Sequence, residues 1–197
     1  MKAFLEVHNL SKSFGEVVVL QNVNFCLFPQ QNYALMGRSG SGKTTLLRIL
    51  MGLESADSGE LLWQGASPRI SAVFQEDRLC ETFSPLENIR MVLPQRYPQQ
   101  RLLEECAKLL PKEALSRPVS TLSGGMKRRV AILRAVLAPS DFLILDEPFS
   151  GLDETTKSCV IRYLLEKSAG RSILFTTHNS EEVAQMQAQP LPKFAKF

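Results

Sequence analysis

The segment GRSGSGKTT, residues 37–45, limits what this chain can fold into more than any other part of its sequence. It follows the apolar run YALM and precedes the apolar run LLRIL. Its three glycines, two serines and two threonines cannot contribute to a packed core, whereas glycines allow the backbone to turn tightly. The sequence therefore predicts a strand, a small polar loop and a helix in direct succession.

The spacing of this segment, Gly37-x₄-Gly42-Lys43-Thr44, is that of a phosphate-binding loop. In such a loop, backbone N–H groups and the helix N-terminus point at phosphate oxygens. Lys43 is expected to reach the β and γ phosphates, and the Thr44 hydroxyl is expected to bind Mg²⁺. The alternative is a flexible glycine-serine turn before a helix. We predict that a nucleoside triphosphate is bound by Gly37, Arg38, Ser39, Gly40, Ser41, Gly42, Lys43, Thr44 and Thr45.

Length and composition indicate an ordinary globular protein. The 197 residues fit one domain with its own core, and 44% are hydrophobic. The net charge of +3 is too small to indicate nucleic acid, and we interpret the basic run Lys127, Arg128 and Arg129 as a solvated helix face. The four cysteines lack CxxC spacing, so we expect reduced thiols and neither a disulfide framework nor a zinc site.

Membrane-spanning and targeting segments are not expected. No apolar run approaches the roughly 20 residues that cross a bilayer. The first ten residues, MKAFLEVHNL, are unlike a signal peptide. Any action at a membrane would therefore go through a partner protein.

Apolar segments with strand and helix spacing alternate along the chain, which predicts a mainly parallel sheet with helices on both faces. Strands are predicted at 3–7, 17–20, 23–28, 33–36, 60–63, 72–74, 142–146 and 172–177, and helices at 43–51, 84–93, 99–110, 123–138 and 154–167. We expect one domain over residues 1–197. Residues 1–75 and 123–197 would form an α/β core, and about 76–122 an inserted helical lobe. Two prolines within 188–197 oppose a regular strand there, and no regulatory domain is expected after it.

An acidic pair follows the apolar strand FLIL. Asp146 is placed near the carboxyl edge of a parallel sheet, where ligands gather. We expect Asp146 to lie on the magnesium side of the site, and the adjacent Glu147 to polarise the attacking water. The alternative is a strand end followed by an acidic turn, which is common where no phosphate-binding loop is present.

Kinases and GTPases also have phosphate-binding loops, and the segment TLSGGMKRRVAILRA, residues 121–135, separates this chain from them. It resembles the signature segment of the ATP-binding cassette (ABC) family, Leu-Ser-Gly-Gly-Gln, with Met126 where glutamine is usual. The resemblance implies that Ser123, Gly124 and Gly125 contact ATP held by the other protomer of a dimer. By itself the segment could be an ordinary serine-capped helix start.

Other marks of the family follow in order. Gln75 matches a glutamine near the magnesium and the attacking water, and Asp153 matches the key aspartate of a dimer-interface loop. His178 resembles the histidine that hydrogen-bonds the γ phosphate, and Asn179 replaces the usual aspartate after it. Phe14 matches the aromatic residue that stacks on adenine. The alternatives are a polar strand end for Gln75, a helix cap for Asp153, a structural histidine and a packed strand-end phenylalanine.

The resemblance implies a P-loop NTPase core with an N-terminal antiparallel β region, acting as the ATPase subunit of an ABC transporter. Two chains would form a head-to-tail dimer around two ATP and Mg²⁺, at the cytoplasmic face of the cell membrane and held there by permease subunits. One chain would supply Lys43, Thr44, Gln75, Asp146, Glu147 and His178 to a site that the other chain completes.

Residues 74–89, FQEDRLCETFSPLENI, are similar to the corresponding part of bacterial importers of the nitrate, sulfonate and taurine type. This similarity implies an importer with an external substrate-binding protein. The alternative is a soluble ABC ATPase that drives an assembly machine. A kinase or GTPase is disfavoured because no Asn-Lys-x-Asp guanine-reading motif is present.

Overall fold

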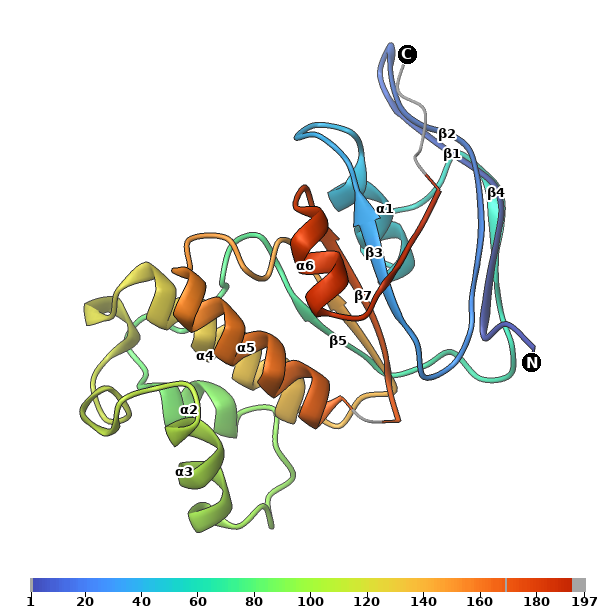
Figure 1. The fold of residues 1–197 in the computed structure, drawn as a ribbon. Helices are drawn as coiled ribbons and strands as arrows, with labels where there is room; N and C mark the ends of the chain where they lie inside the picture. The colour runs from blue at the N-terminus through green and yellow to red at the C-terminus, as the bar shows by residue number, and fades with distance from the viewer. Residues whose placement is uncertain (1, 169, 193–197) are drawn as a thin grey trace.

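The strands divide into two sheets, one antiparallel and one parallel (Figure 1). The computed structural model describes residues 2–168 and 170–192. The parallel sheet has the order β5-β6-β7-β3-β8, and the antiparallel sheet has the order β2-β1-β4. The predicted α/β fold with an N-terminal antiparallel region is therefore confirmed.

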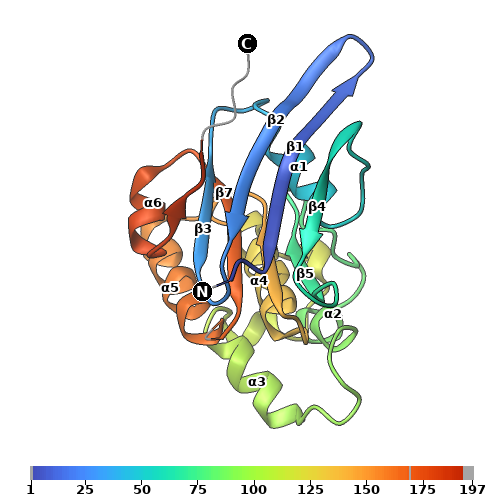
Figure 2. The same cartoon turned by 90° about the vertical axis from the view of Figure 1, so that its right-hand side faces the viewer.

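The antiparallel sheet is built from longer strands than the sequence predicted. It consists of β1 (Leu5–Phe14), β2 (Val17–Leu27) and β4 (Ser58–Trp63). The predictions of separate strands at 17–20 and 23–28, and of a first strand ending at residue 7, were wrong. Register shifts in β1 and the positive φ angles of Asn9 and Asn22 absorb the polar residues, so that pairing continues past them. In Figure 2 this sheet lies in front of the parallel sheet.

The parallel sheet brings the carboxyl ends of its strands to one edge. Its strands are β3 (Asn32–Met36), β5 (Ile70–Val73), β6 (Phe142–Leu145), β7 (Ser172–Thr177) and β8 (Gln189–Pro190). All residues of β6 and β7 are buried, which is typical of parallel strands covered on both faces. Because Met36 pairs with Thr177, and both Val73 and Phe175 pair with Leu145, the segments that follow these strands emerge side by side.

Two apolar clusters cover the two faces of the parallel sheet. Phe142 and Ile144 of β6 pack with α1 (Lys43–Leu50) and the antiparallel sheet. Leu143 and Leu145, on the opposite face, pack with α4 (Gly124–Leu137) and α5 (Glu154–Lys167). The alternation of side chains along β6 therefore joins both layers to one strand.

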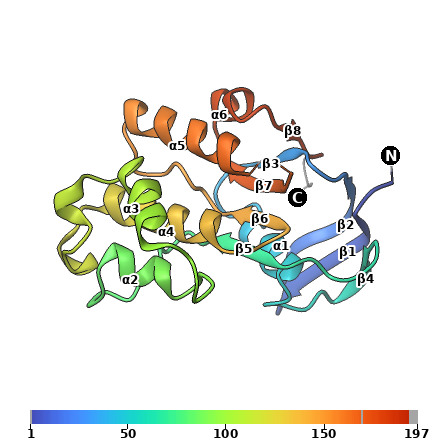
Figure 3. The ribbon, with the colours of Figure 1, turned by 90° about the horizontal axis from the view of Figure 1, so that it is seen from below.

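A group of short helices packs against α4 at one end of the molecule, and the antiparallel sheet lies at the other (Figure 3). The group comprises α2 (Pro85–Arg90), α3 (Gln99–Ala107) and the 3₁₀ helices η1 (Lys112–Ala114) and η2 (Val119–Thr121). The predicted helices 84–93 and 99–110 were too long. Their last turns tighten into i→i+3 hydrogen bonds, as from Leu93 N to Arg90 O and from Leu109 N to Cys106 O, shortly before Pro94 and Pro111 respectively.

The end of the described chain returns to the sheet after α6 (Ser180–Gln185). Strand β8 pairs parallel with β3, and Leu191 N donates to Ala34 O (2.9 Å). The expectation that prolines exclude a strand from 188–197 was wrong at residues 189–190, because β8 is an edge strand on which a missing N–H is tolerated. Residues 193–197 lie outside the described part of the chain. Among the described residues, no helix has the length and apolar character needed to span a membrane.

Candidate functional site

The polar loop 37–42 connects β3 to α1 at the carboxyl edge of the parallel sheet, as predicted. Gly42 precedes the helix with a φ of 87°, and a Cβ at this position would lie 2.7 Å from Val19 O of β2. A Cβ at Gly37 would lie 2.6 Å from Ser41 Oγ. Position 42 therefore requires glycine, whereas at position 37 rotation of the Ser41 hydroxyl would relieve the contact. No side-chain cap covers the N-terminus of α1. The loop thus presents backbone N–H groups suited to an anion.

Lys43 is buried at the first position of α1 and turns back over the loop. Its Nζ donates to Gly37 O (2.9 Å) and to Arg38 O (3.0 Å). Only 6% of the residue is exposed. The ammonium charge therefore lies within the loop that we predict to bind phosphate.

A hydrogen-bonded group joins α1 to the ends of β6 and β7. Thr44 Oγ1 donates to Asp146 Oδ2 (2.7 Å), and Thr176 Oγ1 donates to Asp146 Oδ1 (2.6 Å). The backbone N–H of Glu147 in turn donates to Thr176 Oγ1 (2.8 Å). Carboxylate and hydroxyl oxygens are ligands that Mg²⁺ accepts in proteins, so the residues present fit a magnesium site. Thr176 was not predicted, because no motif in the sequence marks it.

Glu147 lies where two pockets meet. The loop-side pocket is lined by Val19, Ser39, Gly40, Gly42, Lys43, Thr44, Thr45, Gln75 and Glu147. Glu147 also lines the adjoining pocket, together with His178, Asn179 and Glu182. The structure therefore brings Gln75 and Glu147 beside the phosphate-binding loop and places His178 on the far side of Glu147.

The backbone of Glu147 adopts a φ of 46°, in the left-handed region that a non-glycine residue occupies only at a cost. Strained backbone of this kind persists where surrounding contacts determine it, and it is concentrated at functional sites. Here the hydrogen bond from Glu147 N to Thr176 Oγ1 supplies such a contact.

Ser123, Gly124 and Gly125 form the start of α4, apart from this pocket. Ser123 is exposed, and its Oγ accepts a hydrogen bond from Met126 N (3.3 Å). None of the three is among the described residues that line the loop-side pocket. The structure thus shows a serine-capped helix start, and contact with a partner's nucleotide remains a prediction.

Asp153 and Phe14 are exposed on other elements. Asp153 caps α5, where its Oδ1 accepts from Thr156 N (2.9 Å), and this backbone hydrogen bond lowers the pKa of its carboxyl. Phe14, at the end of β1, is 49% exposed and has Lys12 Nζ 5.0 Å from its ring centroid. The structure therefore shows the helix cap, and the dimer-interface and adenine-stacking roles remain predictions.

The expectation of a solvated basic face was wrong for Arg128, which is only 6% exposed. Its guanidinium donates to Phe74 O (2.6 Å) and Gln75 O (2.8 Å). Helical periodicity could have revealed this burial, because Arg128 lies three and four positions before the buried residues Ala131 and Ile132.

Comparisons with known proteins agree with this site. A family model described as ABC transporter matches residues 20–150, a range that contains the phosphate-binding loop, Gln75, Ser123 and the Asp146-Glu147 pair. Similar proteins include the Nod factor export ATP-binding protein I of Cupriavidus metallidurans, 37% identical over 94% of this chain and 66% of that protein. The sulfate/thiosulfate import ATP-binding protein CysA of Methylococcus capsulatus is 36% identical over 92% of this chain and 58% of its own length.

The aliphatic sulfonates import ATP-binding protein SsuB 1 of Frankia alni is 39% identical over 90% of this chain and 66% of that protein. The chain thus spans 58% to 66% of the length of these three relatives. The family match covers most of the chain and includes the phosphate-binding loop and the acidic pair. This protein belongs to the ABC transporter family.

Proposed function

We propose that this chain is the ATP-hydrolysing, nucleotide-binding subunit of an ABC transporter. The observation that carries the proposal is the hydrogen-bonded group of Thr44, Asp146, Thr176 and Glu147 beside the phosphate-binding loop. This group holds the Thr44 hydroxyl against the buried Asp146 carboxylate, and both Thr44 and Glu147 line the loop-side pocket in which we propose that the triphosphate binds. The relatives are named as ATP-binding proteins of import and export systems, which supports the same function.

The residues of the loop would hold ATP. Backbone N–H groups from Gly37 to Thr45 and the Lys43 ammonium would bind the β and γ phosphates. Thr44, Asp146 and Gln75 would hold Mg²⁺, which neutralises charge on the phosphates when it is bound. Among the described residues, no group of three or more His, Cys, Asp or Glu side chains could hold a metal ion. Mg²⁺ usually keeps several water ligands and binds substrate phosphates, so it needs only one or two protein carboxylates.

Glu147 would act as the general base in hydrolysis. Its carboxylate would accept a proton from water as the water oxygen bonds to the γ phosphorus, while the bond from that phosphorus to the bridging oxygen breaks. The products are ADP and inorganic phosphate. His178, from the adjoining pocket, would donate a hydrogen bond to the γ phosphate, and Gln75 would orient the water.

Two chains would share each ATP in a head-to-tail homodimer. Ser123, Gly124 and Gly125 are at an exposed helix start outside the loop-side pocket of their own chain. A second helix N-terminus, with glycines at its first two positions, is suited to contact the partner's triphosphate. Asp153, exposed at the start of α5, would lie at the same interface.

The chain would act with integral-membrane permease subunits as a peripheral protein on the cytoplasmic face of the membrane. We infer import, with an external substrate-binding protein, because residues 74–89 resemble sulfonate-type importers and several relatives are named as importers. A relative named for export is 37% identical, so overall identity does not decide the direction. Copurification of a permease with this chain tests the partnership.

Glu147→Gln tests the proposed hydrolysis. The amide keeps the size of the side chain but cannot accept the proton, so turnover is expected to fall on the order of 10²- to 10⁴-fold. ATP affinity, measured with a fluorescent ATP analogue, should change less than about threefold, because a general base adds little to ground-state binding. With ATP and Mg²⁺ the variant should elute as a dimer in size-exclusion chromatography.

Glu60→Gln is the control, because Glu60 is an exposed glutamate on β4, away from the site. This variant should hydrolyse ATP at the wild-type rate. Hydrolysis by Glu147→Gln within a few-fold of wild type would remove Glu147 as the base. A wild-type chain that binds no ATP would overturn the proposed function.

A further inference from the structure

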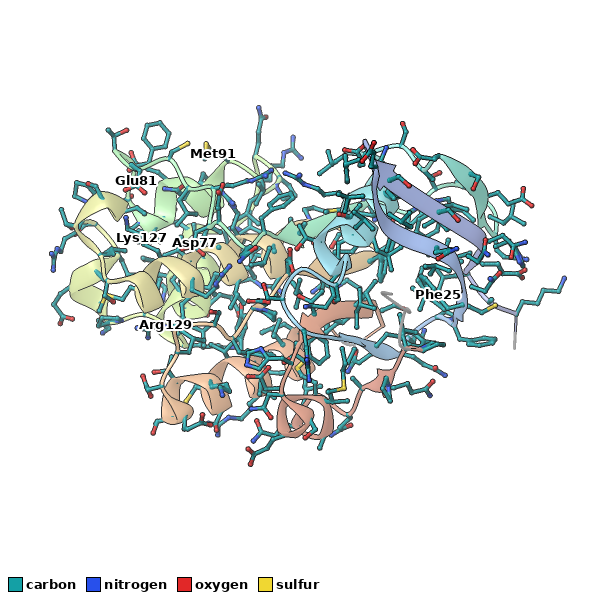
Figure 4. The ribbon with its side chains drawn as sticks, turned by 90° about the horizontal axis from the view of Figure 1, so that it is seen from above. Phe25, Asp77, Glu81, Met91, Lys127 and Arg129 are labelled. Carbon is teal, nitrogen blue, oxygen red and sulfur yellow. The ribbon has the colours of Figure 1, made fainter. Side chains whose placement is uncertain are left out.

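Two arginines of α4 hold the backbone of the segment that follows β5. Arg128 donates from Nη1 to Phe74 O (2.6 Å) and from Nη2 to Gln75 O (2.8 Å). Arg134 donates from Nη1 to Arg78 O (2.9 Å) and from Nη2 to Asp77 O (3.1 Å). We call Arg128, Arg134 and residues 74–78 the arginine clamp. Figure 4 labels Asp77 beside Lys127 of α4, and Glu81 beyond them.

Arg128 is the buried member of the clamp, so the loss of its hydrogen bonds would be strongly destabilising. Arg128 is 6% exposed, and burial lowers the pKa of Arg134, an effect that the nearby Cys80 and Asp77 partly oppose. A buried guanidinium without acceptors is strongly unfavourable. The fork of an arginine is planar, so two carbonyls bound to it are restricted in direction as well as distance. Helix α4 therefore holds the backbone carbonyls of residues 74–78 in place.

In the clamp, Arg128 donates hydrogen bonds to backbone carbonyls and none to the nearby carboxylate oxygen Oδ1 of Asp77. Its Oδ1 lies 3.2 Å from Arg128 Nη1, yet this oxygen is buried and accepts no hydrogen bond from any described residue. Burial raises the pKa of Asp77, and the charge of Arg128 opposes that rise. An unconstrained arginine commonly pairs with a carboxylate through both of its terminal nitrogens. Here both nitrogens donate to the carbonyls on either side of the Gln75 Cα.

These two hydrogen bonds fix the position of the Gln75 Cα and the direction in which its side chain leaves the backbone. Phe74 O belongs to the peptide before the Gln75 Cα, and Gln75 O belongs to the peptide after it. With both peptide planes held, the two backbone dihedrals of Gln75 are restricted. Gln75 lines the loop-side pocket with Thr44 and Glu147. A small shift of this backbone would therefore displace the glutamine from the metal and the water.

We propose that Arg128 is a positioning residue that holds Gln75 in the loop-side pocket and links it to the helix beginning at Ser123. This inference rests on the proposed function for the role of Gln75. Arg128 lies about one turn after the start of α4. Any displacement of that helix start, for instance by a partner's nucleotide, is carried to Gln75 through two hydrogen bonds. Lys127, whose Nζ lies 3.0 Å from Glu81 Oε2, adds a link from α4 to the chain that follows this segment.

A double-mutant cycle between Arg128→Met and Gln75→Ala tests the proposal. Misplacement of a reacting group by about 1 Å can lower a rate about 10²-fold. Arg128→Met alone is therefore expected to lower kcat roughly 10- to 100-fold, with ATP affinity within about threefold of wild type. In the Gln75→Ala background the same substitution should lower kcat less than about twofold, because the glutamine side chain that Arg128 positions is absent there. Full multiplication of the two effects would overturn the proposal.

Arg171→Met is the matched control. Arg171 is a part-buried arginine that donates to Lys167 O (2.8 Å) and to Ser140 Oγ (3.2 Å), near the amino ends of β6 and β7. The effects of Arg171→Met and Gln75→Ala on kcat should multiply, because the two residues act independently. If Arg128→Met does not fold, Arg128→Lys replaces it. Lysine keeps the charge but loses the planar fork, so an intermediate loss of kcat is expected, again absent in the Gln75→Ala background.

Hydrogen exchange of the nucleotide-free chain gives a readout that is independent of hydrolysis. Arg128→Met should accelerate exchange of the Asp146 amide, which donates to Val73 O directly before the clamp segment (2.8 Å), by roughly tenfold, because the segment opens locally more often. Arg171→Met should leave the exchange of this amide unchanged. Unchanged exchange in Arg128→Met would overturn the clamp even if the chain hydrolyses ATP. Conversely, absence of hydrolysis by the wild-type chain would overturn the proposed function and leave the exchange test intact.

Discussion

At the scale of single residues, unusual backbone conformations position the site. Gly42 at the start of α1 has a φ of 87°, and Glu147 after β6 has a φ of 46°. For a non-glycine residue such a conformation costs about 1–3 kcal/mol. Glycine avoids this cost at position 42, whereas position 147 requires a carboxylate for the proposed chemistry. The contact with Thr176 therefore stabilises Glu147 in a conformation that it would otherwise leave.

Gly42→Ala and Gly52→Ala separate backbone strain from steric conflict. Gly52 also has a positive φ, 68°, but a Cβ there would meet nothing within 4 Å. We expect Gly52→Ala to lower the free energy of unfolding by about 1 kcal/mol. Gly42→Ala should lower it by a further ~1–3 kcal/mol, because its Cβ would press on Val19 O. Urea denaturation measures both, and equal losses would show that the contact with β2 does not matter.

The residues that the sequence predicted best are those whose spacing is tied to one chemistry. Lys43 and Thr44 follow from the phosphate-loop pattern, and Asp146 and Glu147 follow from an acidic pair after a buried strand. The structure brings all four together. Thr176 and Arg128 were missed for different reasons. A threonine within a buried strand matches no motif that predicts a functional role. The charge of Arg128 led us to predict an exposed side chain, although its position is on the buried face of α4.

At the scale of elements, a buried glutamate joins α3 to α5. Glu105 accepts hydrogen bonds from Tyr163 Oη (3.0 Å) and Lys108 Nζ (3.3 Å), and Lys167 Nζ lies 2.7 Å from its Oε1. Burial alone would raise the pKa of Glu105, but the hydrogen bonds from Lys167, Tyr163 and Lys108 together lower it from its usual value of 4.5. The ionised carboxylate is therefore the form that connects the two helices.

Glu105→Gln should lower the free energy of unfolding at pH 7 by about 1–3 kcal/mol, because it removes charged hydrogen bonds in a buried place. A group with a lowered pKa in the folded state stabilises above its unfolded pKa and loses that effect as pH falls. The difference between wild type and variant should therefore shrink below pH 4.5, the usual value for a glutamate. Denaturation at a series of pH values measures it. Glu104→Gln, at the exposed neighbour, should show neither effect.

Element types were easier to predict from the sequence than element ends. The strands of the parallel sheet are short apolar runs with no competing pattern, and four of the five were predicted close to their observed positions. The bulged strands β1 and β2 were divided because asparagines interrupt the apolar pattern, which pairing with a neighbour overrides. Strand β8 was missed because its proline disfavours a strand everywhere except at a sheet edge.

At the scale of the whole molecule, the site lies where separate parts of the fold converge. The carboxyl edge of the parallel sheet supplies the loop, Asp146 and Glu147. The arginine clamp connects that edge to α4, against which the short helices α2 and α3 pack. A chemical change at the phosphates therefore has a packed route to the surface of those helices. This arrangement suits a subunit that performs work on another protein.

The proposed transporter function requires above all that this other protein is a membrane permease. The direct measurement is affinity capture of this chain from detergent-solubilised membranes of its native cells, with the copurifying chains identified and quantified by mass spectrometry. We expect a polytopic membrane protein in near-equal amount, retained through washing and absent from a capture with an unrelated bait. Recovery of this chain from the cytosolic fraction with soluble partners alone would contradict the transporter function.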